Sequence, residues 1–291
     1  MEQVLVNSIV AASVYALLSL GFGLIFSTAR FFHFAHGAVY AWAAYVAFTV
    51  SALWGWPLAI GIICGIVAAA ALGSACELVV YRTMRRRGAS TLTLLLSGLG
   101  LYMVMQNGLS LVFGDGNKAL RTWPAGEGFA LAGARVTGVQ IAIVIAASLL
   151  LIAVWLLLHR TGVGLRFRAV SNDQDLASAV GTHVDRSILL AFALGSALAG
   201  GAAILISLDV DMTPNMGFIG LMMAVAASIV GGIGSIPGAA LGALIVAFAQ
   251  QLSAWWLPSQ WQDPIAFGIL FVFLIIRPQG VFGQRIKKAS I

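Results

Sequence analysis

Charged residues are scarce in this chain. Only 9% of its 291 residues are Asp, Glu, Lys or Arg, whereas 60% are hydrophobic. Soluble domains carry roughly 25% charged residues, so this composition is too poor in charge to cover a water-exposed surface. A lipid bilayer is the solvent that such a chain requires, and a single membrane domain over residues 1–291 is predicted.

Cysteine and the common catalytic motifs are also rare or missing. Cys64 and Cys76 lie in one apolar run without a CxxC pair. They are therefore expected to pack as small apolar side chains and not to serve metal or redox chemistry. The phosphate-binding pattern GxxxxGK[ST] is missing, as are GxSxG and HExxH, so the sequence predicts no enzyme and no ATP site in this chain.

Long apolar runs are what the chain has instead. A spanning helix needs about 20 mostly apolar residues. The first run has Glu2 and no basic residue before it, so we expect it to stay as a membrane helix and not to be a cleaved signal. The last run is short, and "GGIGSIPGAALG" between the seventh and eighth fits either a tight turn or a re-entrant element. The prediction is an all-α, polytopic membrane protein with eight or nine transmembrane helices, at about 4–27, 34–54, 57–80, 91–113, 138–158, 187–208, 218–235, 239–257 and 264–277.

The basic residues predict the orientation of these helices. With the N-terminus outside, only Lys118, Arg121 and Arg135 of the 16 Lys and Arg residues fall in the outer loop, at 114–137. The rest fall on the cytoplasmic side, including Arg285, Lys287 and Lys288 of the tail, as the positive-inside rule requires. The C-terminus is thus predicted to be cytoplasmic. The net charge of +6 follows from topology and calls for no nucleic acid partner, and the outer stretch "FALAGARVTG" suits a hairpin around Ala132 and Gly133.

One cytoplasmic loop, residues 159–186, is too polar to span a membrane. It contains a predicted short helix that Ser171 or Asn172 caps and that Gly181 ends. Two acidic residues lie in its first turn, where the helix dipole favours them, and an apolar stripe follows: Asp173, Asp175, Leu176, Ala179 and Val180. Such a helix could lie on lipid headgroups or dock onto a cytoplasmic partner, and the residues alone favour neither.

Four motifs in order bring in a resemblance. "HFAHG" follows the first apolar run, "FALGSALAG" follows the polar loop, and "GGIGSIPGAALGA" and "RPQGVFG" stand near the end. Together they span most of the chain, which resembles permease subunits of ABC importers of the branched-chain amino acid type. That broad family also includes importers of urea, amides and aromatic acids. Two departures leave the solute open: His33 stands where the family often has Asn, and Ala38 where it often has an acidic residue.

The resemblance implies a function and a set of partners. The chain would be a bacterial inner-membrane permease that moves a small solute, a branched-chain or other amino acid. It would pair with a second related permease, receive the solute from an external binding protein, and need no cofactor of its own. Two cytoplasmic ATPases would use ATP and Mg²⁺ and dock at the coupling loop, residues 159–186, through Arg168, Asn172, Asp173, Asp175, Leu176, Ala177, Val180 and Gly181.

The alternative to the importer is a stand-alone channel or a gradient-driven transporter for a small neutral solute. Such transporters usually carry ionisable residues within their spans, and this chain has almost none there. An intramembrane enzyme would require a compact set of acid, base or metal residues, which the sequence does not provide.

The stretch "RFFHFAHGAVY" between the first two apolar runs carries two histidines. His33 and His36 are three residues apart, but no third ligand is near them, whereas zinc sites normally have three or four. We expect no metal here and interpret the stretch as the inner turn, with Arg30 on the cytoplasmic side. His36 could bond the exposed helix end or contribute to a gate.

Polar residues inside the predicted spans are candidates for the translocation pathway. Polar groups at membrane depth must pair with each other or line a cavity, so each of them could equally form an interhelical hydrogen bond. The candidates are His36, Ser97, Gln106, Asn107, Gln250 and Gln251.

Overall fold

The computed structural model describes residues 1–121, 128–131, 133–277 and 279–282. Ala132, Arg285, Lys287 and Lys288, on which parts of the hairpin and topology predictions rest, lie outside the described residues.

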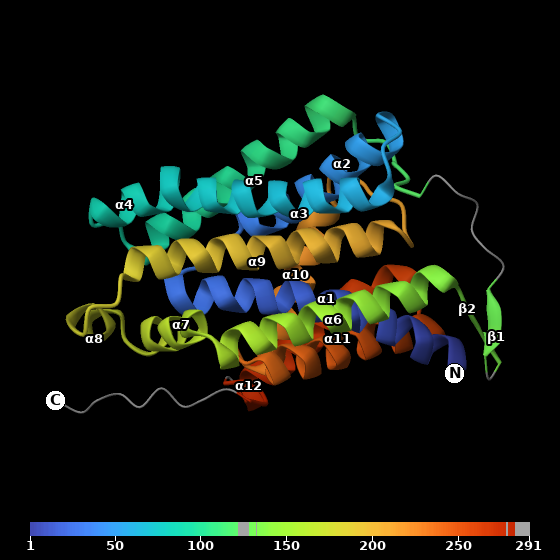
Figure 1. The fold of residues 1–291 in the computed structure, drawn as a ribbon. Helices are drawn as coiled ribbons and strands as arrows, with labels where there is room; N and C mark the ends of the chain where they lie inside the picture. Colours follow the sequence, from blue (N-terminus) through green and yellow to red (C-terminus); the bar gives the residue numbers. More distant parts are fainter. Residues whose placement is uncertain (122–127, 132, 278, 283–291) are drawn as a thin grey trace.

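Helices make up almost all of the described chain (Figure 1). The elements are α1 (Glu2–Ala29), α2 (Ala35–Phe48), η1 (Thr49–Leu53), α3 (Leu58–Ala75), η2 (Cys76–Tyr81), α4 (Arg82–Arg86), α5 (Thr91–Phe113), β1 (Phe129–Leu131), β2 (Ala134–Val136), α6 (Gly138–Arg160), α7 (Gly162–Asn172), α8 (Gln174–Ala179), α9 (Val184–Ser207), α10 (Met216–Gly231), α11 (Ile236–Trp256), η3 (Ser259–Trp261) and α12 (Gln262–Ile276).

Six helices of the described chain are long and apolar enough to cross a membrane. They are α1, the continuous helix Leu58–Arg86, α5, α6, α9 and α11. Each remaining apolar run also contains a helix, but α10 has 16 residues and α12 has 15. At 1.5 Å per residue α10 is about 24 Å long, shorter than the hydrocarbon core of about 30 Å.

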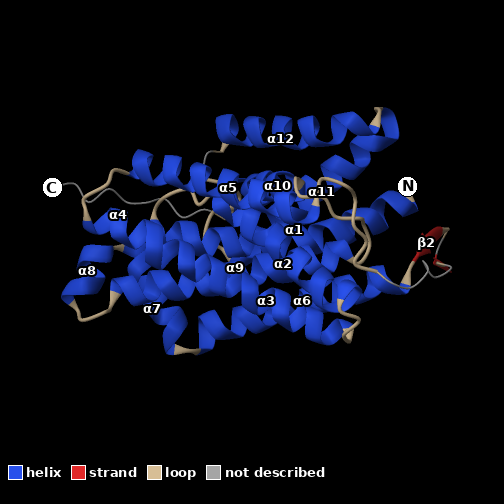
Figure 2. Ribbon diagram, turned by 90° about the horizontal axis from the view of Figure 1, so that it is seen from above, coloured by secondary structure: helices blue, strands red, loops and turns tan. Residues whose placement is uncertain are grey.

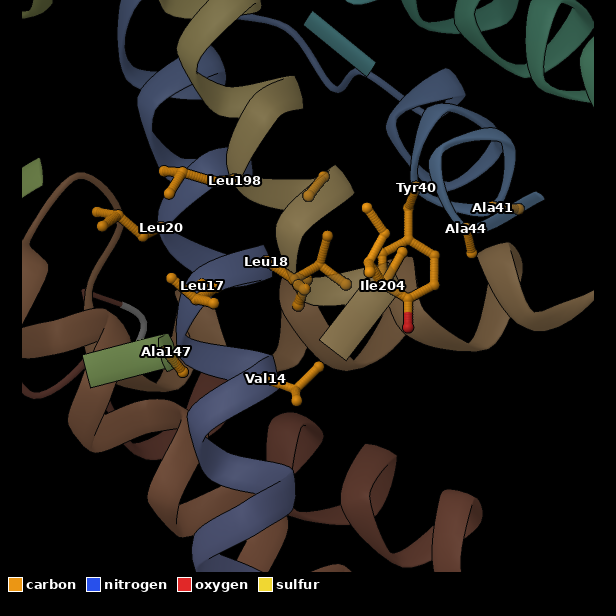
Figure 3. Close-up of a cluster of buried hydrophobic side chains, with 14 of the residues drawn as sticks. Val14, Leu17, Leu18, Leu20, Tyr40, Ala41, Ala44, Ala147, Leu198 and Ile204 are labelled. Carbon is orange, nitrogen blue, oxygen red and sulfur yellow. The ribbon is translucent and has the colours of Figure 1, made fainter. Parts of the chain in front are cut away.

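The core of the bundle surrounds α1 and α9. In their most apolar stretches 78% of α1 and 67% of α9 is buried, compared with 17% of α5 and 22% of α6. Figure 3 shows Leu18 of α1 and Ile204 of α9 close to Tyr40 of α2, whereas Leu17 points to the other side of α1, where Ala147 lies. Small residues let these helices approach closely, where packing must replace hydrophobic drive. The long outer helices therefore present their apolar faces to the surroundings, and α12 lies along one edge of the bundle (Figure 2).

The two ends of the bundle differ in character. α4, α7 and α8 gather at one end, and the N-terminus and the hairpin β1–β2 lie at the other (Figure 1). The predicted hairpin is confirmed by the antiparallel pairing of Phe129 with Val136. The first turn of α1 is fastened to it, because the Gln3 side chain accepts from the Arg135 amide at 2.9 Å and donates to the Arg135 carbonyl at 3.2 Å.

Candidate functional site

The polar loop folds into two short helices, α7 and α8, where one was predicted. Asp173 caps α8, since its carboxylate accepts the backbone N–H groups of Asp175 and Leu176, both at 2.9 Å. The predicted caps Ser171 and Asn172 are wrong, because α7 continues through both residues and ends at Asn172. A carboxylate at this position satisfies two free amides of the helix end and complements its dipole.

The far end of α8 agrees with the prediction for Gly181. Its φ is +86°, a left-handed conformation that glycine adopts without strain. The side chains of α8 divide between two sides: Ala177 is 3% exposed and packs within this chain, whereas Leu176 is 64% and Val180 73% exposed. The exposed apolar surface of α8 is therefore formed by Leu176 and Val180, whereas Ala177, predicted as a docking contact, faces inward.

Two contacts connect the end of α7 and the start of α8 with the end of α1. The guanidinium of Arg30 donates to the carbonyl oxygens of Ser171 and, at 3.2 Å, Asn172. The side-chain amide of Gln174 donates to the carbonyl of Thr28 at 2.6 Å. These bonds satisfy carbonyl groups at helix ends. A displacement of α8 would consequently act on the residues that lead from α1 into α2.

A charged cluster connects the start of α9 with α4 and η2. Asp185, in the first turn of α9, accepts from Arg82 at 3.0 Å and from Arg86 at 3.1 Å. Arg85 lies 3.8 Å from Asp185 and also forms a two-point pair with Glu77, whose side chain is fully buried. A buried carboxylate requires such a partner. Only residues 180–183 separate α8 from α9, so this cluster fixes the segment that the chain enters on leaving α8.

Residues 30–34, which we call the α2 lead-in, run back into the bundle. Phe31 and His33 are 1% and 0% exposed, and the ring of His36 lies 6.3 Å from the ring of Phe22. Phe22 is about two turns of α1 before the helix ends. The predicted inner turn thus begins at the surface with Arg30, but α2 starts inside the bundle.

The two histidines are held among aromatic rings. His33 Nδ1 lies 2.9 Å from the hydroxyl of Tyr81 in η2, and its ring centroid is 4.9 Å from that of Phe192. Within the described residues, neither ring nitrogen of His36 has a hydrogen-bond partner, so the predicted bond to the helix end is not formed. His33 and His36 belong to no cluster of three or more metal-ligating side chains in the described part of the chain.

α10 also starts inside the bundle, after residues 208–215, which we call the α10 lead-in. Gly217 in its first turn packs on Gly37 of α2, and a Cβ atom on either glycine would collide with the carbonyl of the other. Asn215, just before α10, accepts a hydrogen bond from the side chain of Gln106 in α5. Gln106, one of the predicted pathway residues, therefore lies beside the start of α10, which in turn packs on the start of α2.

The other pathway candidates are scattered. Asn107 is exposed on α5 next to Gln106, and its amide donates to the Met103 carbonyl at 2.7 Å. Ser97 also lies on α5 and donates to the carbonyl of its own helix four residues earlier. Gln250 is buried on the other side of α1, where it accepts from Tyr15 at 2.8 Å and donates to Asp263 at 2.8 Å, and Gln251 is half-buried beside it.

Sequence reasoning missed Asn215 and Tyr81. Asn215 lies in "DMTPNMG", a run of turn-forming residues before an apolar stretch, and that is a usable signal for a helix that starts late. Tyr81 carries no local signal, because its role depends on the approach of His33 from 48 residues away.

The comparisons with known proteins agree with one another. The family model described as "Branched-chain amino acid transport system / permease component" matches residues 4–275. The high-affinity branched-chain amino acid transport system permease protein LivH of Escherichia coli K12 is 34% identical over 298 residues, covering 97% of this chain and 95% of LivH. BraD of Pseudomonas aeruginosa, of the same description, is 33% identical over 296 residues with the same coverage.

A solved structure has a similar fold. PsaBC from Streptococcus pneumoniae, in complex with Fab, matches with a TM-score of 0.50 and 13% sequence identity, over 95% of this chain and 92% of that chain.

Proposed function

Since the chain belongs to the family of branched-chain amino acid transport system permease components, we propose that it is the membrane-spanning subunit of an ATP-driven importer. Its solute would be a branched-chain or related amino acid, as the names of LivH and BraD state for those relatives. The chain itself would carry no ATP site, and two cytoplasmic ATPases would supply the energy. An external binding protein would deliver the amino acid, and a second permease would complete the membrane unit.

The proposed mechanism begins at α8. ATP binding would bring the ATPases together and displace α8, whose exposed Leu176 and Val180 would occupy a cleft on one of them. The displacement would reach α1 through Gln174 and Arg30, and α9 directly through the chain. The spans would then exchange outward and inward access as rigid bodies, as alternating access generally works.

The observation that carries this proposal is the position of one exposed helix between two parts of the core. α8 has six residues and leaves two large apolar side chains exposed, Leu176 and Val180. The same helix is fastened to the end of α1 and precedes the charged start of α9.

Topology forms part of the proposal. With the N-terminus outside and the C-terminus inside, the number of crossings is odd, and we propose nine, with α2, α10 and α12 completing the six long helices. The support is the separation of charge in the structure. Arg85 and Arg166 stand at the α8 end, and Lys118 and Arg135 at the hairpin end. An impermeant thiol reagent should therefore label Lys118→Cys from outside intact cells and leave Arg86→Cys unlabelled.

The decisive experiment changes the exposed face of α8. Leu176→Glu with Val180→Glu should reduce ATP-driven amino acid uptake at least tenfold and reduce recovery of the ATPases with the purified permease. Membrane insertion should be normal because both side chains are exposed. Leu165→Glu on α7, at a residue also 64% exposed, is the matched control and should leave uptake unchanged. If the double variant and the control had the same uptake and the same recovery of the ATPases, α8 would merely lie on lipid headgroups.

The second candidate, a channel or gradient-driven transporter, predicts a different result. Proteoliposomes that contain the permease alone would then take up the amino acid without ATPases or ATP. Uptake that requires the ATPases and hydrolysable ATP would exclude this candidate.

A further inference from the structure

Asn215, at the end of the α10 lead-in, and the neighbouring face of α5 are exposed at a depth where lipid could not solvate them. Asn215 accepts from Gln106, which lies seven residues before Phe113, the last residue of α5. Seven residues of helix correspond to about 10 Å. The first part of the α10 lead-in lies near the end of the bundle, because Met212 and Lys118 exchange backbone hydrogen bonds at 2.8 and 2.9 Å. If α5 spans the bilayer as proposed, Asn215 and the last residues before it lie within the hydrocarbon region.

Non-helical backbone is tolerated at that depth only where protein or a water-filled cavity covers it. The chain covers it incompletely. Asn215 is exposed, and so is the side chain of Asn107, one residue beyond Gln106 on α5. An amide facing lipid tails would remain without partners outside the protein, which is costly. Another polar or protein surface must therefore complete this face.

The residues around these amides suit contact with a second helical subunit. Gly100 lies two turns before Asn107 on α5, and nothing is within 4 Å of the position a Cβ atom would take there. Small residues of this kind allow helices to approach closely. Met103, Phe218 and Ile219 flank the amides and are 56%, 45% and 49% exposed.

The outward faces of other helices differ from this one. On α6 the exposed residues Ile145, Leu149 and Ile152 are all apolar, as are Ile63 and Val67 of α3. Such faces are satisfied by lipid. The mixture of amides, glycine and non-helical backbone is found at the α5–α10 face.

We propose that this face, formed by Gly100, Met103 and Asn107 of α5 with Asn215, Phe218 and Ile219 of α10, packs against the second permease subunit and lines the amino acid path between the two. Depth decides the occupant, because a binding protein or an ATPase outside the bilayer cannot reach 10 Å into it. Neutral amides suit the solute, since each can donate to a carboxylate and accept from an ammonium group. The inference rests on the proposed function, which supplies the pair of permeases.

The test uses the assembled transporter in proteoliposomes, with Cys64 and Cys76 replaced by alanine. Single cysteines at Met103, Asn107 or Ile219 carry a spin label, and collisions with oxygen and with a water-soluble nickel chelate are measured. Leu149→Cys and Val67→Cys, 62% and 60% exposed, are the matched controls for lipid. We expect oxygen accessibility at the three test sites to be at least threefold below the controls, and nickel accessibility at Asn107→Cys at least threefold above them.

Cross-linking identifies the occupant. Oxidation of Ile219→Cys in transporters with a cysteine introduced on the second permease should give an adduct of two permeases. Oxygen accessibility equal to that of Leu149→Cys, or an adduct with an ATPase or binding protein, overturns the inference.

ATP-driven uptake by proteoliposomes of the parent transporter, in which only Cys64 and Cys76 are replaced by alanine, separates the two levels of the proposal. Normal uptake with a lipid-facing α5–α10 face refutes the interface and leaves the importer intact. Absence of uptake from the complete assembly refutes the proposed function.

Discussion

Two helices, α2 and α10, start inside the bundle, and the chain buries the segments that lead into them to different extents. The α2 lead-in is covered by its own chain: Phe31 is 1% and His33 0% exposed. The α10 lead-in is left partly open, with Val210 57% exposed and Asn215 exposed. The comparison indicates that the first belongs to the stability of the subunit, whereas the second is completed by something outside the chain. Changes at the first should therefore cost folding, and changes at the second should cost transport.

The largest loss of stability is expected at the ion pair between Glu77 and Arg85, close to the α2 lead-in. Arg85→Gln would leave the carboxylate of Glu77 buried without its partner, in η2, the segment that also holds Tyr81. Breaking a buried pair from one side costs about 3–5 kcal/mol, and such a loss exceeds a third of the stability of many proteins. Thermal unfolding in detergent should show a Tm many degrees lower and a low yield. The double variant with Glu77→Gln should recover part of the loss, and no recovery would contradict the pairing.

A smaller loss is expected where α2 meets α10. Gly37→Val would push a side chain into the backbone of Gly217. Overpacking of this kind costs about 1–3 kcal/mol, and the two helices would have to separate. Tm and uptake should both fall. Gly268→Val on α12 is the matched control, because nothing lies within 4 Å of a Cβ atom there, and an equal loss in both variants would argue against the contact.

Removal of one hydrogen bond should have a similar or slightly smaller effect. Tyr81→Phe would leave His33 Nδ1 without its partner at 2.9 Å, and an unsatisfied buried polar group costs about 1–3 kcal/mol. The Tm of the variant in detergent measures this. A double-mutant cycle with His33→Phe isolates the pair, and strictly additive changes would mean that the two side chains do not interact.

The smallest effect on stability is expected at the α10 lead-in. Asn215→Ala removes an exposed side chain, and such substitutions usually change stability by less than about 0.5 kcal/mol. Uptake should nevertheless fall several-fold, because the amide lies on the proposed path. A variant with reduced Tm and normal uptake would mean that the α10 lead-in serves the stability of the subunit and not transport.

The helices were predictable from the sequence because the period and length of apolar runs are local properties. The run 91–113 coincides with α5, and the predicted hairpin is present as the antiparallel pair β1–β2. The motifs likewise sufficed to predict the family, because their order along the chain is itself information.

The depth of the α2 lead-in and the direction in which the side chains of α8 face were not predictable in the same way. Nothing in "RFFHFAHG" distinguishes a surface turn from a segment that folds back to Phe22, since the difference depends on α5 and α9. The predicted cap of α8 was wrong because Ser171, Asn172 and Asp173 can all cap, and the extent of α7 decides among them. The resemblance named Ala177 among the docking residues, but neither the motifs nor the periodicity can tell which side of α8 faces the chain's own core.

The bond between Gln3 and Arg135 has a consequence for the order of assembly. It joins residues 132 apart, and the entropy lost in closing such a loop of flexible chain is on the order of 4 kcal/mol. Two exposed hydrogen bonds contribute only about 0.5–1.5 kcal/mol each, so they could not close that loop unaided. The hairpin can fasten the start of α1 only after α6 has already been brought beside it. This contact should consequently be among the last to form during synthesis, and its formation would mark the hairpin end of the bundle as complete.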